Sequence, residues 1–127
     1  GEKVIYGDIK SFSIEIKEDP IITTNNVTNI TGIDSGWGVY YDYSVQFNGT
    51  IYDRGNPAYY ERGFVYGTSS SVTASTGTKL SVSGTGEGNF STKTTLNVWT
   101  SSRWYVRAYA RTSNGYTYGD PVMFNLQ

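Results

Sequence analysis

Residues 37–52 read WGVYYDYSVQFNGTIY and carry the clearest strand pattern of the chain. Every second position from Trp37 to Ile51 is apolar or aromatic except Gly49, and the positions between them are mostly small or polar. Successive side chains of a β-strand point to opposite faces, whereas a helix repeats every 3.6 residues and could not use this alternation. The stretch therefore predicts a long strand with one buried face.

Six further segments show strand character, and turn residues separate them. The seven predicted strands cover residues 21–30, 37–52, 59–67, 79–83, 90–98, 104–112 and 116–126. Asn114-Gly115 is a strong hairpin signal, because both residues tolerate positive φ. Pro121 cannot donate to a ladder, which indicates an edge strand or a bulge. Seven short antiparallel strands predict an all-β fold, a seven-stranded antiparallel β-sandwich.

The pattern of residues 59–67 leaves the inward face of this strand open. Phe64 and Tyr66 fall on one face and Val65 falls on the other. Since both faces carry bulky apolar side chains, alternation alone does not decide between them.

One short phrase occurs twice in the chain. Tyr6-Gly7-Asp8 and Tyr118-Gly119-Asp120 are each followed, four residues after the Asp, by Phe. This repetition indicates a tandem array. We interpret residues 1–18 as the last strand of a preceding repeat or a linker, and residues 19–127 as one domain. The extra N-terminal strand, residues 4–16, is expected to pair with a sheet edge in its own chain or in a second copy, giving a strand-mediated dimer.

The composition argues against several classes of function. The chain has no Cys and no His, so it lacks a thiol nucleophile and the commonest general base. Its net charge of −1 disfavours nucleic acid as a partner, and no apolar run approaches the ~20 residues of a membrane helix. The carboxylates of Asp34, Asp42, Asp53 and Glu61 match no calcium-loop spacing. We expect no enzyme, no cofactor, no metal site and no membrane insertion by this segment.

Several phrases between residues 20 and 127 carry a resemblance to a known family. They are residues 20–31, residues 44–51, Glu61-Arg62-Gly63-Phe64-Val65-Tyr66, Gly84-Thr85-Gly86 with Asn89-Phe90-Ser91, and residues 104–110 with Asn114-Gly115 and Tyr118-Gly119-Asp120. This part of the chain resembles the fibronectin-type-III-like repeats found in surface proteins of Gram-negative gut anaerobes. The resemblance implies an immunoglobulin-like sandwich in an exported bacterial protein, extracellular or at the cell surface, with a lipoprotein anchor as one option.

Two groups of residues are candidates for a binding face. The first group occupies outward positions of the last strands and consists of Tyr105, Arg107, Tyr109, Arg111, Tyr116 and Tyr118. The second group lies near turns and consists of Trp37, Trp99 and Tyr59. Aromatic rings stack on sugars, and Arg adds cation–π and bidentate contacts. The alternative for both groups is ordinary packing, as cross-strand pairs or as plugs at the ends of the sandwich.

These observations lead to two hypotheses of function. The first is a non-catalytic surface-protein module that acts as a structural spacer or as a protein-interaction or adhesion unit. Its partners would be other domains of the same parent chain and a protein or glycan ligand. The alternative is a carbohydrate-binding module that uses the exposed Tyr/Arg/Trp face.

Overall fold

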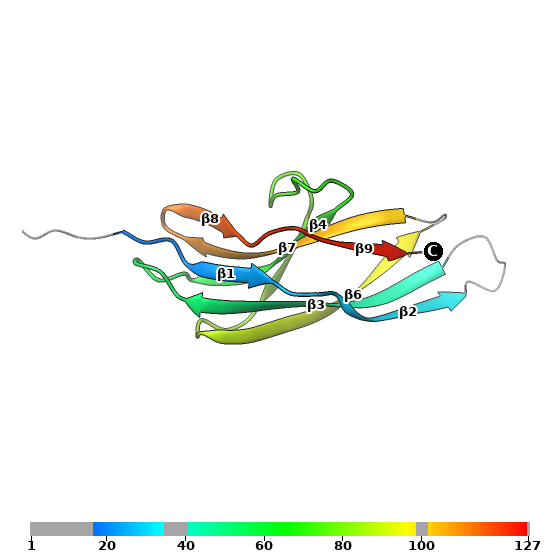
Figure 1. Ribbon diagram of the computed structural model, residues 1–127, viewed down its shortest axis with the longest axis horizontal. Helices are drawn as coiled ribbons and strands as arrows, with labels where there is room; N and C mark the ends of the chain where they lie inside the picture. Colours follow the sequence, from blue (N-terminus) through cyan, green and yellow to red (C-terminus); the bar gives the residue numbers. More distant parts are fainter. Residues whose placement is uncertain (1–16, 35–40, 99–101, 127) are drawn as a thin grey trace, which may run out of the picture.

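The computed structural model describes residues 17–34, 41–98 and 102–126, and this part of the chain is entirely β (Figure 1). Its strands are β1 (Ile21–Thr24), β2 (Thr28–Asp34), β3 (Tyr41–Asp53), β4 (Glu61–Gly67), β5 (Thr78–Val82), β6 (Gly88–Val98), β7 (Ser102–Thr112), β8 (Gly115–Tyr118) and β9 (Val122–Leu126). It contains no helix that could cross a membrane.

The strands form two antiparallel sheets, as the all-β prediction requires. In the first sheet β3 pairs with β6 on one side and with both β1 and β2 on the other. The second sheet has the order β5-β4-β7, and both β8 and β9 pair with the remaining side of β7. The two sheets pack face to face as a β-sandwich, with the strands running along the long axis of the molecule (Figure 1).

The predicted count of seven strands was wrong for the described residues, which form nine. The predicted strand 21–30 is interrupted between Thr24 and Thr28, and the predicted strand 116–126 is interrupted between Tyr118 and Val122. In the first gap Asn48 Nδ2 donates to Asn26 O at 2.9 Å, and in the second Pro121 has no N–H to donate. Asn29, with φ 53°, lies inside β2, where the pairing with β3 shifts its register. Backbone irregularity at two edges thus divides two continuous patterns into four short strands.

The gap between β8 and β9 is a point where the two sheets are joined. Gly119 donates its N–H to Ala108 O at 2.8 Å, and Thr24 Oγ1 accepts the N–H of Ala108 at 2.8 Å. A Cβ on Gly119 would lie 2.6 Å from Thr24 Oγ1 and 2.8 Å from the Thr24 backbone nitrogen. Glycine is therefore required here, which gives the Gly of the second Tyr-Gly-Asp phrase a structural reason.

The first copy of that phrase lies outside the described residues, as do the predicted extra strand and the dimer contact at residues 4–16. Glu18 is described, and its backbone exchanges two hydrogen bonds with Asn56, at 2.8 and 2.9 Å. Glu18 is thus attached to the loop after β3, one residue before the predicted domain boundary at residue 19.

The core lies between the sheets and is built around β3. Tyr43, Val45, Phe47 and Ile51 are buried, as their alternation predicts. The ring of Phe47 is fully buried, and its centroid lies 5.3 Å from that of Tyr66, 5.7 Å from that of Phe64 and 5.6 Å from that of Phe124. One side chain of the first sheet thus contacts three rings of the second.

The inward face of β4, which the sequence left open, is the face of Phe64 and Tyr66. Val65 points to the other side, yet it is also fully buried. It packs in a second apolar cluster with Val72 and Tyr109, because the loop 68–77 brings Val72 against the outer face of the sheet. Both faces of β4 are therefore covered.

Gly63→Ala is expected to destabilise the domain. A Cβ at this position would lie 1.9 Å from Leu80 O and 2.8 Å from Ser81 Cα, both backbone atoms of β5. Overpacking of this kind costs about 1–3 kcal/mol or more. Urea unfolding measures the loss. Gly86→Ala is the matched control, since no atom lies within 4 Å of its added Cβ; equal midpoints for the two variants would contradict the contact.

Candidate binding face

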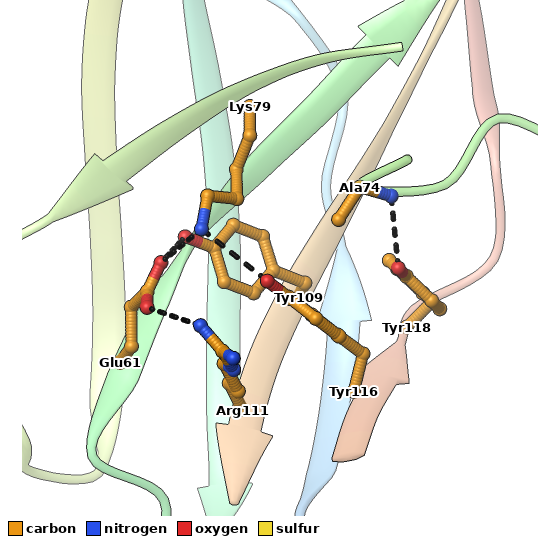
Figure 2. Close-up of polar contacts among 7 residues, drawn as sticks. All are labelled: Glu61, Ala74, Lys79, Tyr109, Arg111, Tyr116 and Tyr118. Atoms are coloured by element: carbon orange, nitrogen blue, oxygen red, sulfur yellow. Dashed lines mark hydrogen bonds and ion pairs between the residues drawn. The ribbon is translucent and has the colours of Figure 1, made fainter. Parts of the chain in front are cut away.

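Five of the six candidates on the last strands gather on the outer face of the β5-β4-β7-β8 sheet, and Figure 2 shows three of them, Tyr109, Arg111 and Tyr116, around Glu61. We call this surface the tyrosine–cation face, and it is formed by Tyr60, Glu61, Lys79, Arg107, Tyr109, Arg111, Tyr116 and Tyr118. The antiparallel register places Glu61 opposite Arg111, Tyr109 opposite Tyr118 and Arg111 opposite Tyr116. Side chains from four segments of the chain are thereby brought together.

Tyr109 does not project into solvent, so its prediction as an exposed platform was wrong. Its relative exposure is 0%, and it packs with Val65 and Val72 beneath the loop 68–77. Its hydroxyl donates to Glu61 Oε2. Burial is the largest of the effects that raise the pKa of the Tyr109 hydroxyl, and the adjacent Glu61 raises it further, so the hydroxyl stays protonated and remains a donor.

Glu61 is the acceptor at the centre of the face. Lys79 Nζ lies 2.9 Å from Glu61 Oε2, and Arg111 Nη1 lies 3.5 Å from Glu61 Oε1. The hydrogen bond from Tyr109 is the main cause that lowers the pKa of the Glu61 carboxyl, followed by the hydrogen bond from Lys79. The hydrogen bond with Glu61 in turn raises the pKa of Lys79. At neutral pH the Glu61 carboxylate is therefore paired with two cations, Lys79 and Arg111.

The half-buried rings of Tyr116 and Tyr118 are covered by cations of the same chain. The guanidinium of Arg107 lies 4.9 Å from the ring centroid of Tyr118, and that of Arg111 lies 5.0 Å from the centroid of Tyr116. The rings of Tyr116 and Tyr118 are also stacked on each other at 5.8 Å with an interplanar angle of 6°. Cation–π contacts form within about 6 Å. Ring faces that could stack on a sugar are thus already in contact with Arg or with a second ring.

Hydrogen bonds hold the same residues in place. Tyr118 Oη accepts the N–H of Ala74 at 2.9 Å, which attaches the loop 68–77 to β8 (Figure 2). Arg107 Nε donates to Gly119 O at 2.8 Å, and Lys79 Nζ donates to Tyr116 Oη at 3.3 Å. Tyr105 lies farther along β7, opposite Gly67 and Met123, and is not part of this network.

The second group of candidates does not form a platform in the described residues. Tyr59 is 2% exposed, and its hydroxyl donates to Gly86 O at 2.6 Å, which agrees with the packing alternative for this residue. The ring of Tyr59 packs with the core. Trp37 and Trp99 lie outside the described residues.

Sequence reasoning missed three members of the face: Tyr60, Glu61 and Lys79. Glu61 was considered only as a calcium ligand, and the described residues contain no group of three or more side chains that could hold a metal ion. The available signal was the single valine, Val72, in the Ser/Thr-rich loop 68–77, which predicts that this loop covers an apolar patch.

No family model, curated protein or solved structure matches this chain.

Tyr109→Ala is expected to lower the free energy of unfolding by about 3–5 kcal/mol, the usual cost of truncating a buried aromatic side chain. Tyr105→Ala, on the same face of the same strand but half-buried, is the control and should cost clearly less. Urea unfolding of the two variants measures the difference. Similar stability of the two variants would show that Tyr109 is not a packing residue.

Stability is expected to fall in acid because of Glu61. Its carboxyl has a pKa below the unfolded value of about 4.3, so its contribution is complete above that pH and is lost as the pH falls through the lower, folded pKa. Glu61→Gln cannot ionise and should be less stable than the wild type at pH 7, with a smaller drop between pH 6 and pH 3. Equal pH dependence of wild type and variant, measured by urea unfolding, would contradict this role.

Proposed function

We propose that this chain is a non-catalytic, fibronectin-type-III-like module of an exported surface protein, and that it acts as a structural spacer between other domains of its parent chain. The proposal continues the family resemblance of residues 20–127, and it places the module outside the cell. Binding of a protein partner at the cell surface is compatible with this role.

The strand arrangement supports the fibronectin part of the proposal. β1 and β2 lie one after the other along β3, and β8 and β9 lie one after the other along β7. When β1 and β2 are counted as one interrupted strand, and β8 and β9 as another, the nine strands become seven. In an immunoglobulin constant domain the fourth strand joins the sheet of the first, second and fifth strands. Here the fourth of the seven strands, β5, joins the sheet of β4 and β7 instead, which favours the fibronectin type.

The observation that carries the spacer proposal is the position of the two ends of the domain. The described chain enters before β1 at one end of the long axis, and β9 leaves at the opposite end (Figure 1). Domains connected through such ends extend in series. The entering strand is held by pairing with β3 and by Thr24, whose Oγ1 accepts the N–H of Ala108 in the opposite sheet.

The tyrosine–cation face favours a structural role over the alternative of a sugar platform. Its central tyrosine is buried, its carboxylate is bonded on both oxygens, and its outer rings are covered by Arg side chains. A ligand that stacked on these rings would first have to displace the Arg side chains. The cost of breaking these contacts counts against a carbohydrate-binding module at this surface.

The spacer proposal is tested by pulling the domain from residues 17 and 126 in a force spectrometer. We expect one cooperative rupture, with about 3.3–3.6 Å gained for each residue released. Thr24→Val removes the acceptor for the buried N–H of Ala108, which costs about 1–3 kcal/mol, and should lower the rupture force.

Thr78→Val, at an exposed position on the edge strand β5, is the control and should leave the rupture force unchanged. Gradual extension at low force, with β1 or β9 released before the rest of the domain, would overturn the proposal, because a spacer must transmit force between its ends.

A further inference from the structure

The outer face of the first sheet carries a hollow of about 320 Å³, on the opposite side of the sandwich from the tyrosine–cation face. Its lining residues are Asn25, Asn48, Gly49, Asn89, Phe90 and Ser91. Ligand pockets in proteins begin at about this size. Gly49 and Phe90 are paired across β3 and β6 and have side chains buried in the core or absent, so they form the floor of the hollow. The polar side chains of Asn25, Asn48, Asn89 and Ser91 form its walls.

One chain of hydrogen bonds crosses three strands at the edge of this hollow. Thr23 Oγ1 donates to Asn25 Oδ1 at 3.2 Å, and Asn25 Nδ2 donates to Thr50 Oγ1 at 2.9 Å. Thr50 Oγ1 then donates to Asn89 Oδ1 at 2.7 Å. These bonds fix which way the amides of Asn25 and Asn89 face before any ligand arrives. A binding group held in this way loses little entropy on binding.

A second chain orients Asn48. Asn29 Nδ2 donates to Gln46 Oε1 at 2.8 Å, and Gln46 Nε2 donates to Asn48 Oδ1 at 2.8 Å. Asn48 Nδ2 donates to Thr28 Oγ1 and to Asn26 O, both at 2.9 Å. The amide of Asn48 is therefore largely satisfied within the protein, and it acts as a rigid wall of the hollow rather than as its main binding group.

Binding capacity remains at Asn89 and Ser91. In the described part of the chain, Asn89 Nδ2 and Ser91 Oγ have no hydrogen-bond partner, and Asn25 Nδ2 uses one of its two N–H groups. An amide offers donors and acceptors, and a hydroxyl offers both. The lining carries no charged side chain. Such a site matches a neutral ligand with several adjacent hydroxyl groups and offers no counter-charge to an anion or a cation.

An exposed aromatic ring lies beside the hollow. Tyr52 follows Thr50 at period two on the same face of β3, and it is 60% exposed. In the described residues its ring has no cation or second ring against it, in contrast to Tyr116 and Tyr118. A ring with a free apolar face next to oriented polar groups can hold the C–H face of a pyranose while the amides bind its hydroxyls.

We propose that this face binds a neutral polysaccharide, with Asn89, Ser91 and Asn25 bonding to sugar hydroxyls and Tyr52 stacking on a neighbouring ring. The site uses none of the residues of the tyrosine–cation face. It goes beyond the spacer function and does not depend on it, since rupture force and sugar binding are measured separately.

The test is native affinity electrophoresis of the domain in gels that contain xylan, mixed-linkage β-glucan, galactomannan or glycogen, with polygalacturonate as a charged comparison. We expect retardation by at least one neutral polysaccharide and none by polygalacturonate. Tyr52→Ala and Asn89→Asp should each weaken that binding at least tenfold. Asn89→Asp keeps the shape of the side chain and removes its N–H donors.

Tyr60→Ala is the matched control, because Tyr60 is 56% exposed but belongs to the tyrosine–cation face; it should leave binding unchanged. Thermal unfolding verifies that all three variants fold, which their exposed positions favour. The proposal is overturned if no neutral polysaccharide retards the domain. It is equally overturned if binding survives both Tyr52→Ala and Asn89→Asp, or if Tyr60→Ala weakens it to the same extent.

Discussion

The contact of Phe47 with three rings of the opposite sheet is the central packing interaction of the sandwich. Phe47 lies at the middle of β3, the strand that holds the first sheet together, and touches Phe64, Tyr66 and Phe124 from β4 and β9. Aromatic pairs of this kind contribute beyond their buried area. With no Cys in the chain, the sheets are held together by such packing and by edge contacts such as that of Thr24 with Ala108.

Packing on the inside also determines what the outside of the second sheet can do. Because Phe64 and Tyr66 face the core, Val65 must face outward, and the loop 68–77 covers it with Val72. Tyr109 is enclosed in the same cluster, so its hydroxyl needs an acceptor, which Glu61 supplies. The cations then gather around this carboxylate. The surface that the sequence suggests as a binding face thus has its polar and charged groups bonded to one another within the chain.

The two outer faces of the sandwich therefore differ in the binding capacity that they leave unused. On the tyrosine–cation face, charges and rings are matched to one another within the chain. On the opposite face, amides are oriented by one another but are not fully satisfied, and the ring of Tyr52 is open. Ligand binding is best served by groups that are oriented and still free. The face that carries Asn25, Asn89 and Tyr52 is therefore the better candidate for a binding site.

The fold class and the buried face of β3 could be predicted from the sequence, because a period of two along residues 43–51 is a property of the strand alone. The sequence also indicated the irregular last strand, since Pro121 has no N–H to donate. What covers each outer face could not be predicted from the sequence: Tyr109 alternates like an exposed residue and is buried by a loop more than thirty positions away. Which polar groups meet could not be predicted either, because Asn25, Thr50 and Asn89 are adjacent only through the register of β1, β3 and β6. The period of two depends only on residues that are neighbours in the sequence. Contacts between distant segments form only when the sheets pack together.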